Sequence, residues 1–88
     1  MTINEQFEQA QQELSRLTKR PSNEEFLELY ALYKQATEGD NDQKKPSRFD
    51  LKKYYKWNSW IEKKGLSTGE AMEKYIAHVE MLMGKYPH

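Results

Sequence analysis

The chain has 88 residues, of which 36% are hydrophobic and 32% are charged, and its formal net charge is zero. This length predicts one domain, residues 1–88, with a small core. The absence of cysteine excludes disulfides and thiolate metal sites. No apolar run is long enough to span a bilayer, and residues 1–6 lack the basic and apolar segments of a secretory signal. We therefore expect a cytoplasmic protein without stable membrane insertion.

Charge is distributed unevenly along the chain. Residues 44–64 carry eight basic and two acidic side chains, whereas residues 1–43 carry nine acidic and four basic ones. The neutral total argues against a general nucleic-acid-binding protein, and a local basic surface favours a compact anionic partner. Taken alone, however, the basic run is explained better by lysine-rich helices that are simply exposed to solvent.

A first helix is predicted to begin after Thr2, because Thr2 and Glu5 have the spacing of a capping box. Apolar side chains then recur at steps of four and three residues, which indicates an amphipathic helix of about four turns. The residues of this stripe are Ile3, Phe7, Ala10, Leu14 and Leu17. The helix should end near residues 18–20, because Pro21 disfavours helical geometry in the residue before it.

The second predicted helix begins after Ser22, which forms a capping box with Glu25, and runs to about Glu38, where Gly39 is a suitable C-cap. Its aliphatic face is typical of a core and contains Leu29, Leu32 and Ala36. A neighbouring face carries Phe26, Tyr30, Tyr33 and Thr37, with Leu27 and Lys34 at its edge. Spacings of three and four residues bring two phenols and an ammonium together, a combination that suits a flat ring beside a phosphate.

Two further helices are predicted in the second half of the chain. Residues 40–49 form a polar connection that is long for a helix-to-helix loop, and this length lets the next helix run parallel to the last. Asp50 should cap a third helix from about Leu51 to Lys64, which Gly65 ends. We expect at least one of its tryptophans, Trp57 and Trp60, to pack across a helix junction.

The fourth helix is predicted from a third capping box, formed by Ser67 and Glu70, and Pro87 ends it. No segment alternates between polar and apolar residues over the length of a strand. The sequence therefore predicts an all-α fold of four helices.

The sequence offers little for catalysis. The only histidines are His78 and His88, and neither has a recognisable partner for acid–base or nucleophilic chemistry. There is no Walker loop, no dinucleotide fingerprint and no cluster of acids that suggests a metal cage. We expect a protein that is not an enzyme, with no catalytic residues, no metal and no cofactor.

Binding is the remaining class of function. Polar-tipped side chains occur on three of the predicted helices: Tyr30, Tyr33, Lys34, Lys52, Lys56 and Tyr75. Singly, each has an ordinary explanation, since tyrosines commonly belong to the core of a small bundle and lysines cover apolar surface with their stems. Jointly, their crowding favours an aromatic, phosphorylated ligand as much as it favours packing alone.

Two motifs make the chain resemble the acyl-CoA-binding protein family. The first reads YALYKQATEGD over residues 30–40, and the second reads KWNSW over residues 56–60. Ala71 and Tyr75 follow at the spacing of the family, and the resemblance covers essentially the whole chain. It implies a four-helix up-down-down-up bundle that binds one medium- to long-chain acyl-CoA ester, without covalent chemistry, for transport or buffering.

The resemblance also implies which side chains meet the ligand. Lys34 and Lys56 would bind the ribose 3′-phosphate, with the Tyr30 hydroxyl as a further donor. Tyr33 and Tyr75 would contact the adenine ring. Phe26 and Leu27 would form walls of an apolar groove for the acyl chain.

Acyl-CoA esters are the implied partners, with transient contacts to enzymes that make or use them, and the chain is expected to be a monomer. The main alternative is a small helical protein–protein interaction module that docks through its basic third helix. It predicts no bound small molecule and a strongly salt-dependent partner. An enzyme that uses coenzyme A is a third hypothesis. It requires catalytic residues, and the sequence shows none that could perform the reaction.

Overall fold

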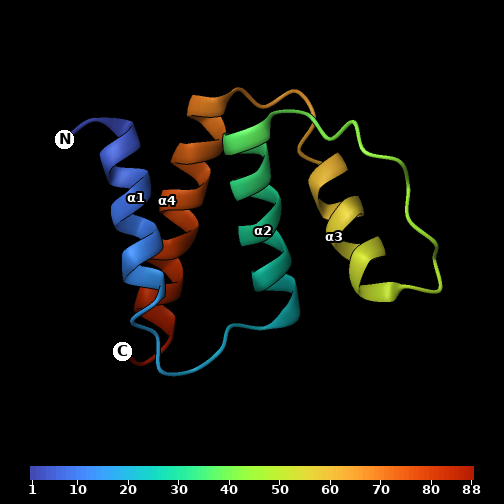
Figure 1. Ribbon diagram of the computed structural model, residues 1–88. Helices are drawn as coiled ribbons and strands as arrows, with labels where there is room; N and C mark the ends of the chain where they lie inside the picture. The colour runs from blue at the N-terminus through green and yellow to red at the C-terminus, as the bar shows by residue number, and fades with distance from the viewer.

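The computed structural model describes residues 1–88 as four α-helices, α1 (Ile3–Leu14), α2 (Asn23–Glu38), α3 (Leu51–Ile61) and α4 (Thr68–Lys85). Figure 1 shows α1 and α4 running in one direction and α2 and α3 in the opposite direction. The structure contains no strand. The predicted all-α, up-down-down-up bundle is therefore confirmed. None of the four helices combines the length and the apolar character that crossing a membrane requires.

Local capping chemistry determines where the helices begin. The three predicted capping boxes are all present, and they pair Thr2 with Glu5, Ser22 with Glu25 and Ser67 with Glu70. The Asp50 side chain accepts a hydrogen bond from the backbone N–H of Lys53 at 3.3 Å and so caps α3 as predicted. Gly39 ends α2 with φ +81°, a conformation that glycine adopts without steric cost.

The end of α1 was predicted too late in the chain. The helix ends at Leu14 and not near residues 18–20, and tight turns follow it. The backbone N–H and the hydroxyl of Thr18 both donate to the Pro87 carbonyl, at 3.0 and 3.2 Å. These two hydrogen bonds fix Thr18 against the C-terminal end of the chain in a non-helical conformation. The helix therefore ends several residues before Pro21.

The end of α3 was also predicted too late. The helix ends at Ile61 and not at Lys64. The backbone N–H groups of Lys63 and Lys64 then bond to carbonyls three residues earlier, in a tighter turn. Gly65 has φ +94°, and its N–H donates to the Asp40 side chain at 2.9 Å. A contact with the connection after α2 therefore shapes this end of α3.

The core lies between α1, α2 and α4, and α3 stands outside it. α4 packs against both α1 and α2, whereas α3 packs against α2 alone. The buried apolar cluster consists of Phe7, Ala10, Leu29, Leu32, Ala36, Ala71, Tyr75, Val79 and Leu82. The predicted aliphatic face of α2 is thus confirmed as core. Because α3 touches one helix only, the side of α2 that faces it is partly open.

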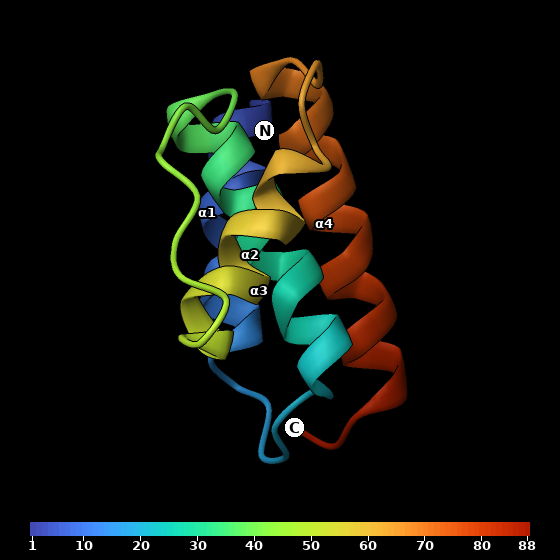
Figure 2. The same cartoon turned by 90° about the vertical axis from the view of Figure 1, so that its right-hand side faces the viewer.

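Two tryptophans of α3 hold the long connection in place. Figures 1 and 2 show residues 39–50 passing along the outer side of α3 before they enter it. The Trp60 indole N–H donates to the Gly39 carbonyl at 2.9 Å, and the Trp57 indole N–H donates to the Gln43 carbonyl at 2.8 Å. Trp60 is almost fully buried. The expectation that a tryptophan packs across a helix junction is confirmed.

Candidate functional site

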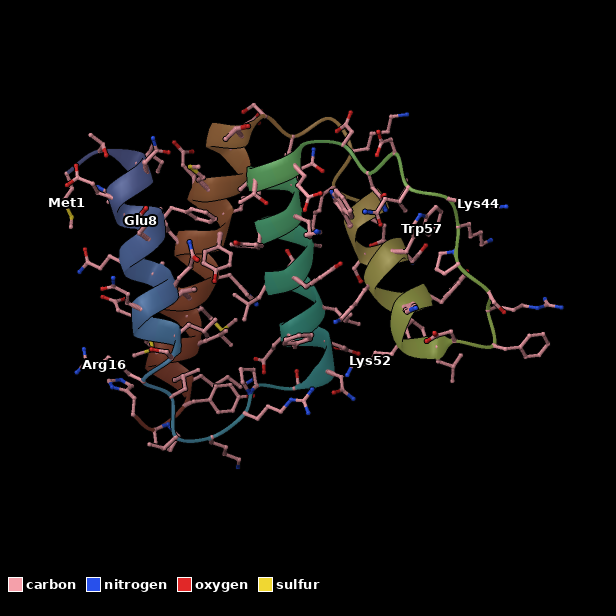
Figure 3. All side chains as sticks on the ribbon, in the orientation of Figure 1. Met1, Glu8, Arg16, Lys44, Lys52 and Trp57 are labelled. Carbon is pink, nitrogen blue, oxygen red and sulfur yellow. The ribbon has the colours of Figure 1, made fainter.

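Two cavities that share Lys56 lie where α2 faces α3. The first, of about 420 Å³, is here called the basic cavity; it is lined by Tyr30, Gln43, Lys44, Pro46, Lys53, Lys56, Trp57 and Trp60. The second, of about 460 Å³, is called the apolar cavity; it is lined by Arg20, Asn23, Glu24, Phe26, Leu27, Lys52, Tyr55 and Lys56. Figure 3 labels one wall residue of each cavity on α3, namely Trp57 of the basic cavity and Lys52 of the apolar cavity.

Lys56 lies at the boundary of the two cavities. Its ammonium is 5.1 Å from the centre of the Tyr30 ring and 5.8 Å from the centre of the Phe26 ring. Phe26 and Tyr30 are four residues apart on α2, so the helix presents both rings on the side that faces α3. Lys56 has no carboxylate partner. Two ring faces thus support its charge, and no acid neutralises it.

Lys34 occupies a different environment. Its ammonium is 5.1 Å from the Trp60 ring centre and pairs with the Glu38 carboxylate one turn later on α2. The hydrogen bond to Glu38 raises the pKa of Lys34 above its ordinary value, and burial opposes this more weakly. Lys34 is therefore a protonated donor, but an incoming anion has to compete with Glu38 for it.

Tyr33 and Tyr75 meet in an aromatic cluster with Phe7, built from α2, α4 and α1. The Phe7 ring lies edge-on to Tyr75 at 4.9 Å between centres and is stacked with Tyr33 at 5.9 Å. Tyr75 is only 4% exposed, and this burial raises its pKa to about 12. Tyr33 is 40% exposed. The cluster therefore offers the Tyr33 ring to solvent and keeps Tyr75 behind it.

The structure divides the predicted site residues into three groups. Phe26, Leu27, Tyr30 and Lys56 line the two cavities. Lys34 lies outside the lining but against Trp60, which belongs to the wall of the basic cavity. Tyr33 and Tyr75 line neither cavity and belong to the aromatic cluster with Phe7.

Several residues of the cavity walls were not among the predicted site residues. Lys52, which the sequence groups with Lys56 among the polar-tipped side chains, lines the apolar cavity. Lys53 precedes Lys56 by three positions on α3 and lines the basic cavity, so helical spacing could have added it to the same group. Lys44 comes from the 39–50 connection, whose path has no periodic signal. Arg20 comes from the turn after α1, and its guanidinium lies 5.7 Å from the Phe26 ring centre.

Neither histidine lines these cavities. The imidazole of His78 is 3.2 Å from the Glu25 carbonyl oxygen, and that of His88 is 3.1 Å from the Met83 carbonyl oxygen. The structure also contains no group of three or more histidine, cysteine, aspartate or glutamate side chains arranged to hold a metal ion. What the arrangement offers is a basic cavity beside an apolar one, with a cation between them.

Comparison with known proteins identifies relatives of this chain. The family model described as acyl CoA binding protein matches residues 4–79. The acyl-CoA-binding protein homolog of Drosophila melanogaster is 51% identical, over 96% of this chain and 98% of its own length. The acyl-CoA-binding protein of Saccharomyces cerevisiae is 48% identical, over 96% of this chain and 97% of its own.

Solved structures give the same result for the fold. The crystal structure of Oryza sativa acyl-CoA-binding protein 2 matches with a TM-score of 0.89 and 40% identity, covering 96% of this chain and 93% of that one. The solution structure of the acyl coenzyme A binding protein from yeast matches with a TM-score of 0.71 and 50% identity, covering 91% of this chain and 93% of that one.

Proposed function

Because the chain belongs to the acyl-CoA-binding protein family, we propose that it binds medium- to long-chain acyl-CoA esters and carries or buffers them in the cytoplasm. It acts as a monomer, holds one ester at a time and contacts the enzymes that make or use the ester only transiently. It performs no covalent chemistry on the ligand.

The observation that carries the proposal is the position of Lys56, an unpaired cation shared by a basic and an apolar cavity. An acyl-CoA ester has the same division, since an anionic nucleotide end is joined to an apolar chain. We assign the 3′-phosphate of the nucleotide end to the basic cavity and the acyl chain to the apolar cavity. Lys56 and Lys34 bind the ribose 3′-phosphate, and the Tyr30 hydroxyl donates a further hydrogen bond.

The adenine ring is assigned to the aromatic cluster. Tyr33 is its exposed member and presents a ring on which a base can stack. Tyr75 is almost fully buried against Phe7 and Tyr33, so its contribution is chiefly to hold the Tyr33 ring in position.

The acyl chain is assigned to the apolar cavity, with Phe26 and Leu27 as walls. Each methylene removed from water contributes about 0.8 kcal/mol, so affinity should rise with chain length until the cavity is filled. The head group then selects the class of ligand, and the chain supplies much of the affinity.

Titration calorimetry with three ligands tests this function. Palmitoyl-CoA should bind with one-to-one stoichiometry and far more tightly than either free palmitate or free CoA, because only the ester fills both cavities. Equal affinity for palmitate and palmitoyl-CoA would identify a plain fatty-acid carrier instead. A native mass spectrum of the protein with a mixture of acyl-CoA esters supplies the stoichiometry independently.

A further inference from the structure

The segment from Lys44 to Tyr55, here called the 44–55 edge, exposes large apolar and aromatic side chains among basic ones. Phe49 is 89% exposed, Leu51 is 58% exposed and Tyr55 is 52% exposed. The same segment has one acidic residue, Asp50, and five basic residues, all of them exposed: Lys44, Lys45, Arg48, Lys52 and Lys53. Elsewhere, the large exposed apolar side chains stand singly: Met1 before α1, Tyr33 on α2 and Met81 on α4.

A tight turn holds Phe49 outward. The Ser47 hydroxyl accepts a hydrogen bond from the Phe49 backbone N–H at 3.2 Å, and the Ser47 carbonyl accepts one from the Asp50 N–H at 3.0 Å. Figure 1 shows that this turn, between the 39–50 connection and α3, lies at the outer margin of the molecule. Phe49 is thus a protruding side chain and not part of a groove.

The 44–55 edge borders both cavities, since Lys44, Pro46 and Lys53 line the basic cavity. Lys52 and Tyr55 belong to the edge and also line the apolar cavity. A surface that receives the edge therefore lies directly beside the space assigned to the acyl chain.

We propose that the 44–55 edge docks on an anionic phospholipid bilayer. Phe49 and Leu51 enter the head-group region, and the five basic side chains contact anionic lipids around them. Aromatic and aliphatic side chains ringed by lysine and arginine are the pattern of interfacial attachment. A bilayer is favoured over a protein because a fluid surface accommodates a protruding phenylalanine, whereas a protein partner needs a matching pocket.

The claim that the edge docks on a bilayer depends only on the exposed residues. The claim about what docking is for depends on the proposed function. With the apolar cavity at the bilayer surface, an acyl chain passes between lipid and protein without crossing bulk water. The edge therefore serves the loading or release of the ester. Because the two claims are separable, the docking experiment uses protein without acyl-CoA.

Flotation with lipid vesicles tests docking. The parent protein should float with vesicles of phosphatidylcholine and phosphatidylserine but not with phosphatidylcholine alone. At about 1 M salt, where the Debye length is about 3 Å, the binding should be lost. A Lys45→Ala/Arg48→Ala variant should lose at least about tenfold in partition, since each basic residue near an anionic surface contributes about 1 kcal/mol. Phe49→Ala should lose roughly tenfold through the missing apolar side chain.

Matched controls separate this surface from charge or apolarity in general. Arg16→Ala/Lys74→Ala removes the same two kinds of charge from exposed positions outside the edge, and Met81→Ala removes an exposed apolar side chain from α4. Both should partition like the parent. Circular dichroism and palmitoyl-CoA affinity in solution should be unchanged in all variants, because none of these side chains lines a cavity.

A fluorescent label locates the contact. The chain has no cysteine, so Phe49→Cys and Met81→Cys each carry a polarity-sensitive dye at one site only. The dye at position 49 should shift to the blue on anionic vesicles, and the dye at position 81 should not change. The proposal is overturned if the parent protein does not float with anionic vesicles. It is also overturned if Phe49→Ala and Lys45→Ala/Arg48→Ala float with them as well as the parent does.

Discussion

The ammonium of Lys56 lies 5.1 Å from the centre of the Tyr30 ring and has no carboxylate partner, whereas Lys34 on the same helix as Tyr30 is paired with Glu38. The two lysines assigned to the 3′-phosphate are thus unequal before any ligand arrives. Lys56 offers its full charge at once. Lys34 has to exchange one anion for another, so its net contribution to affinity is smaller.

We predict that Lys56→Ala weakens palmitoyl-CoA binding more than Lys34→Ala does. A hydrogen bond to a charged group contributes about 1.5–3 kcal/mol, which corresponds to at least a tenfold loss for Lys56. Glu38→Gln should strengthen binding, because it frees Lys34 from its competitor. Titration calorimetry measures the affinity of all three variants for palmitoyl-CoA. Lys64→Ala is the control, because Lys64 is exposed and lines neither cavity. If neither lysine variant differs from the parent, the head-group assignment is wrong.

The same assignment predicts how these variants respond to a modified ligand. Removing the 3′-phosphate from palmitoyl-CoA should weaken binding to the parent and abolish most of the difference between the parent and Lys56→Ala. This is a double-mutant cycle with one change on the ligand, and it isolates the contact between the phosphate and the lysine. An undiminished Lys56→Ala effect with the dephosphorylated ester would assign Lys56 to another part of the ligand.

The helix starts could be predicted from the sequence because a capping box is local: the hydroxyl and the carboxylate are three residues apart. The end of α2 at Glu38 was equally local, since Gly39 follows it, but the ends of α1 and α3 could not be predicted, because distant partners determine them. Thr18 bonds to Pro87, and Asp40 accepts from the Gly65 N–H, and neither pair has a signal in the residues between them. In each case a tertiary hydrogen bond overrides the tendency of the helix to continue.

The candidate site could be predicted in part for the same reason. Helical spacing is sufficient to place Phe26 and Tyr30 on one face of α2. Spacing could not show that Lys56 of α3 would lie over both rings, since that depends on the path of the 39–50 connection. Nor could it distinguish the exposed Tyr33 from the buried Tyr75. The burial of Tyr75 depends on the packing of α4 against Phe7 of α1.

The different exposure of the two tyrosines leads to a third prediction. Tyr33→Ala should weaken palmitoyl-CoA binding by about 1–3 kcal/mol, the usual effect of losing a stacked aromatic partner of a base. Tyr75→Phe keeps the ring that packs on Phe7 and Tyr33, so affinity should stay close to that of the parent. Calorimetry compares the variants, and urea unfolding checks that both are folded. A Tyr75→Phe variant as weak as Tyr33→Ala would instead assign the Tyr75 hydroxyl to the ligand.

A fourth prediction concerns acid stability. The Glu25 carboxylate at the start of α2 accepts hydrogen bonds from Lys85 at 2.8 Å and from the Tyr86 hydroxyl, at the end of α4. The bonds from Lys85, Tyr86 and the Ser22 backbone lower the pKa of Glu25 from 4.5 to about 2. A carboxyl whose pKa is lower in the folded state stabilises that state above its unfolded pKa, and the contribution is lost as pH falls.

The stability conferred by Glu25 should therefore be complete above about pH 4.5 and disappear as the pH approaches 2. Urea unfolding of the parent across this range should show a falling free energy, and Glu25→Gln should be less stable at neutral pH with a flatter dependence on pH. Glu73→Gln, an exposed acid on α4, is the control and should follow the parent. If the free energy of unfolding depends on pH in the same way for the parent and Glu25→Gln, the hydrogen bonds from Lys85 and Tyr86 to Glu25 do not stabilise the fold.

The last prediction uses two glycines as a matched pair. Gly39 has φ +81°, which side chains other than glycine rarely adopt, whereas Gly84 lies inside α4 with open space where a Cβ would be added. Gly39→Ala should destabilise the protein by about 1 kcal/mol or more because of backbone strain. Gly84→Ala should stabilise it by about 0.5–1 kcal/mol, because alanine loses less backbone freedom in a helix.

Urea unfolding at one pH measures the free energy of unfolding of both alanine variants. Titration with palmitoyl-CoA measures their affinity for the ester. The strain at position 39 should also disturb the Trp60 indole, which donates to the Gly39 carbonyl and lies under Lys34. Gly39→Ala should therefore weaken binding as well as stability, and Gly84→Ala should leave binding unchanged. If Gly39→Ala binds like the parent at temperatures where it is fully folded, Trp60 does not position Lys34 for the ligand.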